Sequence, residues 1–136
     1  MKLFEINSIR NITSACCICL DDNDNVLLGL STHDDDRNGK WCFPGGGLKG
    51  GESPENGAER ECFEETGYKS YAIDNHFINP QRPNVGITLC RKINGSMKPN
   101  SEFVKLKWFS VNEILQDDDI YQPNLWTILK VFKVTT

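Results

Sequence analysis

The sequence predicts an α/β fold in which helices cover a mixed β-sheet, an arrangement known as an α/β sandwich. Three observations lead to this prediction: strand-like runs precede and follow one central helix, a second amphipathic helix lies near the end of the sequence, and turn-forming clusters separate the runs. The 136 residues are enough for one sizeable core, so we expect a single domain over residues 1–136.

The first part of the chain is predicted to form two strands followed by a polar loop. Residues 13–20 and 26–30 are rich in apolar residues, and the Asp- and Asn-rich cluster between them is typical of a turn. The polar loop, residues 31–40, contains His33 and the aspartates at 34–36. We interpret the aspartates as solvated surface groups and the histidine as a loop residue rather than a metal ligand.

The central helix is delimited by start and stop signals. Ser53 provides an N-cap, Pro54 suits the first helical position, and Gly67 can adopt the left-handed C-terminal cap. A glycine-rich stretch, residues 45–51, precedes the helix. Because glycine has no Cβ, its backbone can approach a metal or phosphate closely. The sequence therefore predicts a glycine loop that leads directly into a helix.

The part of the chain after the central helix is predicted to contain two strands and two helices. The apolar residues that share one face of the first strand are Val85, Ile87, Leu89 and Ile93. Asn94-Gly95 is a strong turn signal after this strand. Residues 104–108 alternate as a half-buried strand, and 109–115 suggest a strand end followed by a short helix. The apolar stripe that indicates the last helix is Leu125, Ile128, Leu129 and Phe132.

Three carboxylates share one face of the central helix. Glu61, Glu64 and Glu65 stand at i, i+3 and i+4. Like charges at this spacing destabilise a helix by roughly a few tenths of a kcal/mol, so the pattern does not serve helix stability. Clustered hard oxygen donors suit Mg²⁺, Mn²⁺ or Ca²⁺. The competing interpretation is a solvated acidic face, and the surrounding residues decide against it.

These surrounding residues resemble the box of the Nudix hydrolases, in which a glycine, five residues, a glutamate and seven residues precede R-E-U-x-E-E-x-G-U, where U is apolar. Every fixed position of the box is filled over residues 46–68. The residues that fill it are Gly46, Glu52, Arg60, Glu61, Cys62, Glu64, Glu65, Gly67 and Tyr68. The chain is thereby identified as a MutT-like member of this family, and the resemblance implies a Nudix-type α/β/α sandwich.

The resemblance also implies a metal site and a hydrolytic activity. Glu61, Glu64 and Glu65 would hold Mg²⁺, or Mn²⁺ in its place, and the backbone carbonyl of Gly45 would be an additional donor. The general base in this family is either a box glutamate or an acidic residue outside the box. Glu61 is our first candidate for it, and Glu102 is the candidate outside the box.

The remaining box residues are expected to have structural roles. By resemblance, Glu52 and Arg60 form an internal ion pair that braces the glycine loop against the helix. Gly46 and Gly67 complete this structural part of the box, and the carbonyl of Gly46 is the alternative to that of Gly45 as a metal donor. Substitution of either member of the ion pair is expected to damage the site indirectly.

Substrate choice depends on residues outside the box. Pro83 follows Tyr68 by 15 residues, a spacing similar to that of relatives that cleave ADP-ribose, so we favour ADP-ribose-like compounds among nucleoside diphosphate-linked substrates. The alternatives are hydrolysis of nucleoside triphosphates or RNA ends and, from another class, a non-catalytic nucleotide-sensing module. Arg37, Lys40 and Arg82 are the candidate cations for binding substrate phosphate.

Composition narrows the class of partner. Lys plus Arg total 15 and Asp plus Glu total 19, a net charge of −4, which argues against general nucleic-acid binding. The sequence has no apolar run long enough to span a bilayer and no secretory signal, so we expect a cytoplasmic protein, either monomeric or homodimeric. Cys16 and Cys19 would face opposite sides of a strand, and we interpret the six cysteines as small apolar residues.

Overall fold

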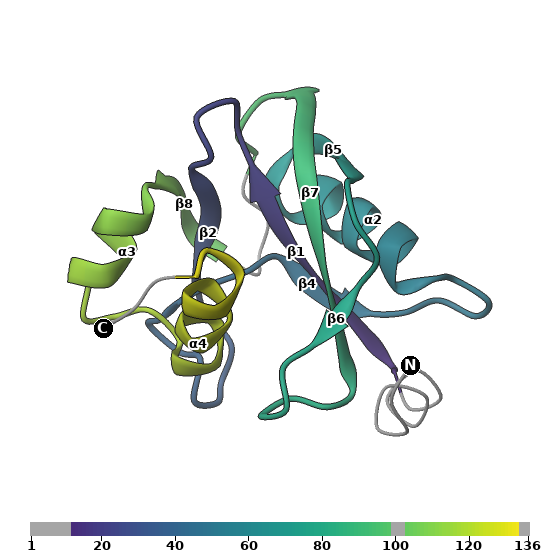
Figure 1. Cartoon of the computed structure of the whole chain (residues 1–136), viewed down its shortest axis with the longest axis horizontal. Coiled ribbons are helices and arrows are strands. Elements are labelled where there is room, and N and C mark those ends of the chain that lie inside the picture. Colours follow the sequence, from purple (N-terminus) through teal and green to yellow (C-terminus); the bar gives the residue numbers. More distant parts are fainter. Residues whose placement is uncertain (1–11, 99–102, 134–136) are drawn as a thin grey trace.

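The structure of the protein is a computed structural model, which describes residues 12–98 and 103–133 (Figure 1). The strands of this part of the chain are β1 (Ser14–Leu20), β2 (Val26–Ser31), β3 (Trp41–Cys42), β4 (Gly45–Gly47), β5 (Tyr68–Ala72), β6 (Phe77–Ile78), β7 (Val85–Gly95) and β8 (Phe103–Phe109). The helices are α2 (Pro54–Thr66), α3 (Val111–Gln116) and α4 (Gln122–Val131). None of the helices within these ranges has both the length and the apolar composition that crossing a membrane requires.

The strands form one mixed sheet. Its main order is β3-β2-β1-β7-β5, and β1 pairs with β7 in parallel, whereas the other pairings are antiparallel. Parallel neighbours need a crossover connection, and α2 lies within the one that joins β1 to β7. The short strand β4 pairs with the first half of β1, where Ala15 lies opposite Gly46. This pairing brings the glycine-rich stretch next to α2.

Helices cover both faces of the sheet, and the alternation of side chains along β1 shows why. On one face, Cys17 and Cys19 pack with Cys62 of α2. On the other face, Ile18 packs in a core that includes Ile128 of α4. Figure 1 shows α2 apart from α3 and α4, with the sheet between them. The predicted α/β/α sandwich with a mixed sheet is therefore confirmed.

The limits of α2 follow from its capping residues. The hydroxyl of Ser53 accepts a hydrogen bond from the backbone N–H of Asn56 at 3.1 Å, which satisfies one of the unpaired donors at the start of the helix. Pro54 begins the helix, and Gly67 ends it in the left-handed conformation with φ 83°. Both helix limits agree with the sequence prediction.

The predicted turn at Asn94-Gly95 is wrong. β7 continues through both residues and pairs with residues 68–69 of β5. A register shift in this pairing leaves Ile93 without a directly opposed residue, and the side chain is 55% exposed. Ile93 therefore does not share the buried face of Val85 and Ile87, as the alternation had suggested. Pairing with a distant strand has overridden the local turn preference.

Candidate active site

The glycine strand β4 lies directly against the acidic face of α2. The backbone N–H of Gly45 donates a hydrogen bond to Oε1 of Glu65 at 2.8 Å. A Cβ added at Gly46 would lie 2.6 Å from Oε2 of Glu61, closer than any side chain tolerates. Two of the three predicted carboxylates thus lie against the backbone of the glycine loop, and a side chain at position 46 would displace the carboxylate of Glu61.

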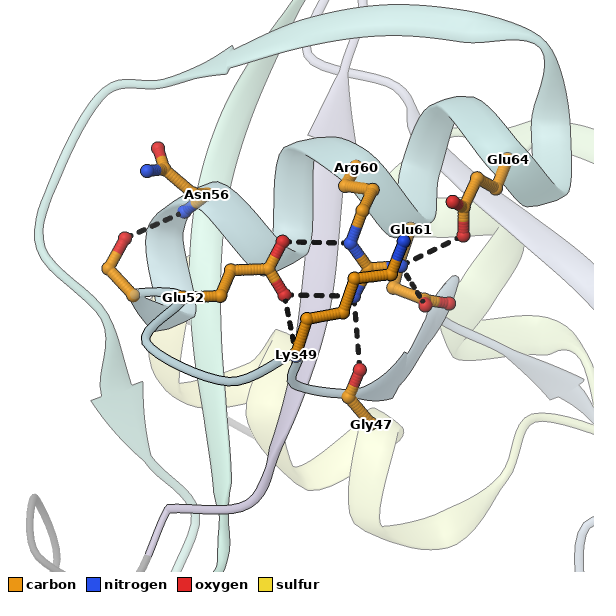
Figure 2. A network of polar contacts seen from close by, with 8 residues as sticks. Gly47, Lys49, Glu52, Asn56, Arg60, Glu61 and Glu64 are labelled. Atoms are coloured by element: carbon orange, nitrogen blue, oxygen red, sulfur yellow. Dashed lines mark hydrogen bonds and ion pairs between the residues drawn. The ribbon is translucent and has the colours of Figure 1, made fainter.

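Arg60 joins the loop to the helix (Figure 2). Its Nε and Nη2 donate to the two carboxylate oxygens of Glu52 at 2.8 and 2.9 Å, and Nη2 also donates to the carbonyl of Gly47 at 3.0 Å. The Arg60 guanidinium lowers the pKa of the Glu52 carboxyl to about 2. Glu52 also accepts a hydrogen bond from the backbone N–H of Lys49. This is the ion pair that the sequence led us to expect, and Arg60 also bonds to the glycine loop through the carbonyl of Gly47.

The same guanidinium contacts two of the helix carboxylates. Nη1 of Arg60 donates to Oε1 of Glu61 at 2.7 Å and to Oε1 of Glu64 at 2.9 Å. The side chain of Glu61 is buried and that of Glu64 is 46% exposed. Figure 2 shows both carboxylates turned toward the guanidinium. The three glutamates therefore occupy one side of α2, with Glu61 and Glu65 beneath the glycine strand and Glu64 at its rim.

The carboxylates suit a divalent cation in chemistry, although they do not converge on one point. Within residues 12–98 and 103–133, no group of three or more His, Cys, Asp or Glu side chains is placed to hold a metal ion. Arg60 carries a positive charge beside Glu61 and Glu64. Three carboxylates and a carbonyl form the hard oxygen set that Mg²⁺ and Mn²⁺ prefer.

A small pocket opens on the glycine strand. Its volume is about 80 Å³, and Gly45 and Gly46 form part of its wall. Two of the three candidate phosphate-binding cations, Arg37 and Arg82, also line it. The third, Lys40, does not, and its ammonium group lies 3.6 Å from a carboxylate oxygen of Asp119. Glu102, the candidate base outside the box, lies outside the described residues.

The beginning of α4 supplies two pocket residues that the sequence did not reveal. Tyr121 and Asn124 line the pocket, and Oδ1 of Asn124 accepts a hydrogen bond from the backbone N–H of Phe43 at 3.0 Å. Nη1 of Arg82 donates to the Tyr121 hydroxyl at 3.0 Å, and the guanidinium carbon lies 5.8 Å from the centre of the phenol ring. The signal available in the sequence was the presence of polar residues at the start of an otherwise apolar helix.

Comparisons with known proteins agree with the box and the fold. The model of the NUDIX domain matches residues 10–129. A MutT-like protein of Streptomyces ambofaciens is 32% identical over 94 residues, which are 67% of this chain and 59% of that protein. An RNA pyrophosphohydrolase of Bartonella tribocorum is 34% identical over 90 residues, 62% of this chain and 47% of the relative. The chain thus spans about half the length of these two relatives.

A solved structure shows the same fold. It is that of an ADP-ribose pyrophosphatase from Streptococcus suis, with a TM-score of 0.65 and 22% identity over 90% of this chain and 92% of that one. At this identity the likeness concerns the fold. Since the NUDIX domain model matches nearly the whole chain, the protein belongs to the Nudix family.

Proposed function

We propose that the protein hydrolyses the diphosphate linkage of a small nucleoside diphosphate-linked compound, with Mg²⁺ as the metal and Mn²⁺ as a substitute. The observation that carries this proposal is the contact between the glycine strand and the acidic face of α2. The same two glycines touch Glu61 and Glu65 and line a pocket that contains two arginines. Groups for metal binding and groups for phosphate binding thus lie on neighbouring surfaces.

Residues of the box and of the glycine loop supply the metal site in this proposal. Glu61, Glu64 and Glu65 hold the metal, together with the carbonyl of Gly45. When bound, a divalent ion neutralises phosphate charge and lowers the pKa of the attacking water. Arg60 keeps the loop and the helix in register, since it bonds to both.

The general base must lie within hydrogen-bond reach of the attacking water. Glu61 is buried beneath the glycine strand, next to the other helix carboxylates, which favours it for this role. Glu102 remains the alternative. Replacing Glu102 by glutamine tests the alternative, because loss of a base outside the ligand set lowers kcat while the carboxylates of α2 still bind the metal.

ADP-ribose-like compounds are the favoured substrates. The spacing of Pro83 from the box supports this. The similarity to an RNA pyrophosphohydrolase supports the second candidate, removal of pyrophosphate from RNA ends or nucleoside triphosphates. The two differ in the second product, since hydrolysis of ADP-ribose gives AMP and ribose 5-phosphate, whereas hydrolysis of a triphosphate releases pyrophosphate.

The test is hydrolysis of a substrate panel with Mg²⁺ and with EDTA. The panel contains ADP-ribose, UDP-sugars, ATP and a 5′-triphosphorylated RNA, and the products are separated by ion-exchange chromatography. We expect AMP from ADP-ribose with Mg²⁺ and no product with EDTA. Tight binding of a nucleotide without turnover of any compound would instead support a sensing module.

We propose further that the protein is cytoplasmic and acts on small molecules, as a monomer or a homodimer. The cysteines are free thiols, which is typical of a reducing compartment. The net charge of −4 does not favour general nucleic-acid binding. Fractionation of cells and light scattering of the purified protein test these points.

A further inference from the structure

The two arginines of the pocket belong to loops that are far apart in the sequence. Arg37 lies in the loop between β2 and β3, and Arg82 lies in the loop between β6 and β7. Tyr121, which immediately precedes α4, connects the two loops. Its hydroxyl accepts a hydrogen bond from Nη1 of Arg82 at 3.0 Å and donates one to Oδ2 of Asp36 at 3.3 Å. Asp36 is the residue next to Arg37.

Tyr121 is itself firmly held. It is 6% exposed, and its backbone N–H donates to the carbonyl of Trp41 at 3.0 Å. One hydroxyl thus fixes Arg82 directly and, through Asp36, fixes the loop that carries Arg37. The phenol ring also lies beneath the guanidinium of Arg82, so both the ring and the hydroxyl of Tyr121 keep this guanidinium in position.

The charge of the pocket points to an anionic ligand. Arg37 pairs with the carboxylate of Asp35, with the closest oxygen 2.6 Å away. The hydrogen-bond partner of Arg82 is the neutral Tyr121 phenol. None of the described residues that line the pocket is an aspartate or a glutamate. A guanidinium bound to a neutral group beside a glycine backbone is suited to receive phosphate oxygens.

We propose that Tyr121 is a positioning residue that keeps Arg82 and Arg37 facing the pocket. There the two guanidiniums bind the phosphate of the substrate that lies farther from the carboxylates of α2. This inference rests on the proposed function, because it assumes that the substrate contains a diphosphate. Tyr121 does not contact the substrate in this account, and it acts through the two arginines.

The test compares Tyr121→Phe with Tyr71→Phe. Tyr121→Phe retains the ring and removes only the hydroxyl, and Tyr71 is an exposed tyrosine on β5 outside the pocket. We expect Tyr121→Phe to raise KM about five- to tenfold and leave kcat within about threefold, since the hydrogen bonds of the hydroxyl to Arg82 and Asp36 are lost. Tyr71→Phe is expected to match the wild type in both constants.

Binding of inorganic pyrophosphate in EDTA provides a readout without catalysis. Isothermal titration calorimetry should show binding about five- to tenfold weaker for Tyr121→Phe. Arg82→Ala should weaken binding at least as much, and Tyr121→Phe should add little in the Arg82→Ala background, because the two residues act as one unit.

Two results would overturn the inference. One is unchanged pyrophosphate affinity and KM in Tyr121→Phe, and the other is full additivity with Arg82→Ala. Neither result affects the proposed function, provided that the wild-type protein hydrolyses its substrate. If the wild type hydrolyses nothing, the proposed function fails, and the pyrophosphate titration still decides the role of Tyr121.

Discussion

Replacing Gly46 by alanine tests the contact between the glycine strand and α2. The added Cβ would lie 2.6, 2.8 and 2.9 Å from Oε2, Cδ and Oε1 of Glu61. Favourable contacts between such atoms need about 3.5 Å, so the carboxylate must move by roughly 1 Å. A misplacement of that size at a catalytic group costs about 100-fold in rate. We therefore expect kcat/KM of Gly46→Ala to fall by about two orders of magnitude.

Stability should change little in the same variant. The clash is with the end of a flexible side chain, and the φ of Gly46 is not in the left-handed region. An alanine at a compatible site also restricts the unfolded chain, which offsets part of the cost by about 0.4–1 kcal/mol. We expect the free energy of unfolding to stay within about 1 kcal/mol of the wild type. Urea unfolding followed by circular dichroism measures it.

Gly47→Ala is the matched control, because a Cβ there has no heavy atom within 4 Å. Steady-state hydrolysis of the best substrate with Mg²⁺ gives kcat/KM for both variants. The reasoning is refuted if Gly46→Ala keeps wild-type kcat/KM, or if both alanines lower it equally.

Three further predictions concern stability and thiol reactivity. Arg60 lowers the pKa of Glu52 from 4.5 to about 2, so the carboxylate contributes stability above pH 4.5 that is lost as the pH falls toward 2. The Tm of Glu52→Gln should therefore lie below that of the wild type at pH 6 and converge with it near pH 2; a gap independent of pH would contradict this. Oγ1 of Thr88 is the one buried side-chain oxygen or nitrogen of the described residues that has no hydrogen-bond partner. Thr88→Val should therefore stabilise the protein by about 1 kcal/mol. Calorimetry should show this as a rise of about 3 °C in Tm. An unchanged or lower Tm would mean that this hydroxyl is satisfied. Cys16 is half-buried, and burial raises the pKa of its thiol to about 11, so little reactive thiolate forms at pH 8. The other five cysteines are buried. Ellman's reagent at pH 8 should react slowly with the native protein and rapidly with all six thiols in guanidinium, whereas rapid native labelling of several thiols would show the core to be open.

The helix and the glycine loop were predictable because their signals are local. Ser53, Pro54 and Gly67 specify the helix limits without help from distant residues. The partners Glu52 and Arg60 are also near one another in sequence, and they meet as the family pattern implies.

The pocket was less predictable because distant segments form it. Asn124 and Phe43 are 81 residues apart, and Tyr121 and Asp36 are 85 apart. No periodicity within α4 indicates that its first turn reaches another loop. The turn predicted at Asn94-Gly95 failed for a similar reason, since its outcome depends on pairing with β5.

The central claim is that the carboxylates of α2 bind the divalent ion on which hydrolysis depends. Titration of Mn²⁺, followed by electron paramagnetic resonance of the free ion, measures this directly. Glu59→Gln is the matched control on the same helix, because glutamine can still accept the hydrogen bond from the backbone N–H of Ala72. We predict that the wild type and Glu59→Gln bind Mn²⁺ and hydrolyse the substrate, whereas Glu64→Gln and Glu65→Gln lose both. Mn²⁺ binding and activity at the wild-type level in the last two variants would contradict the account.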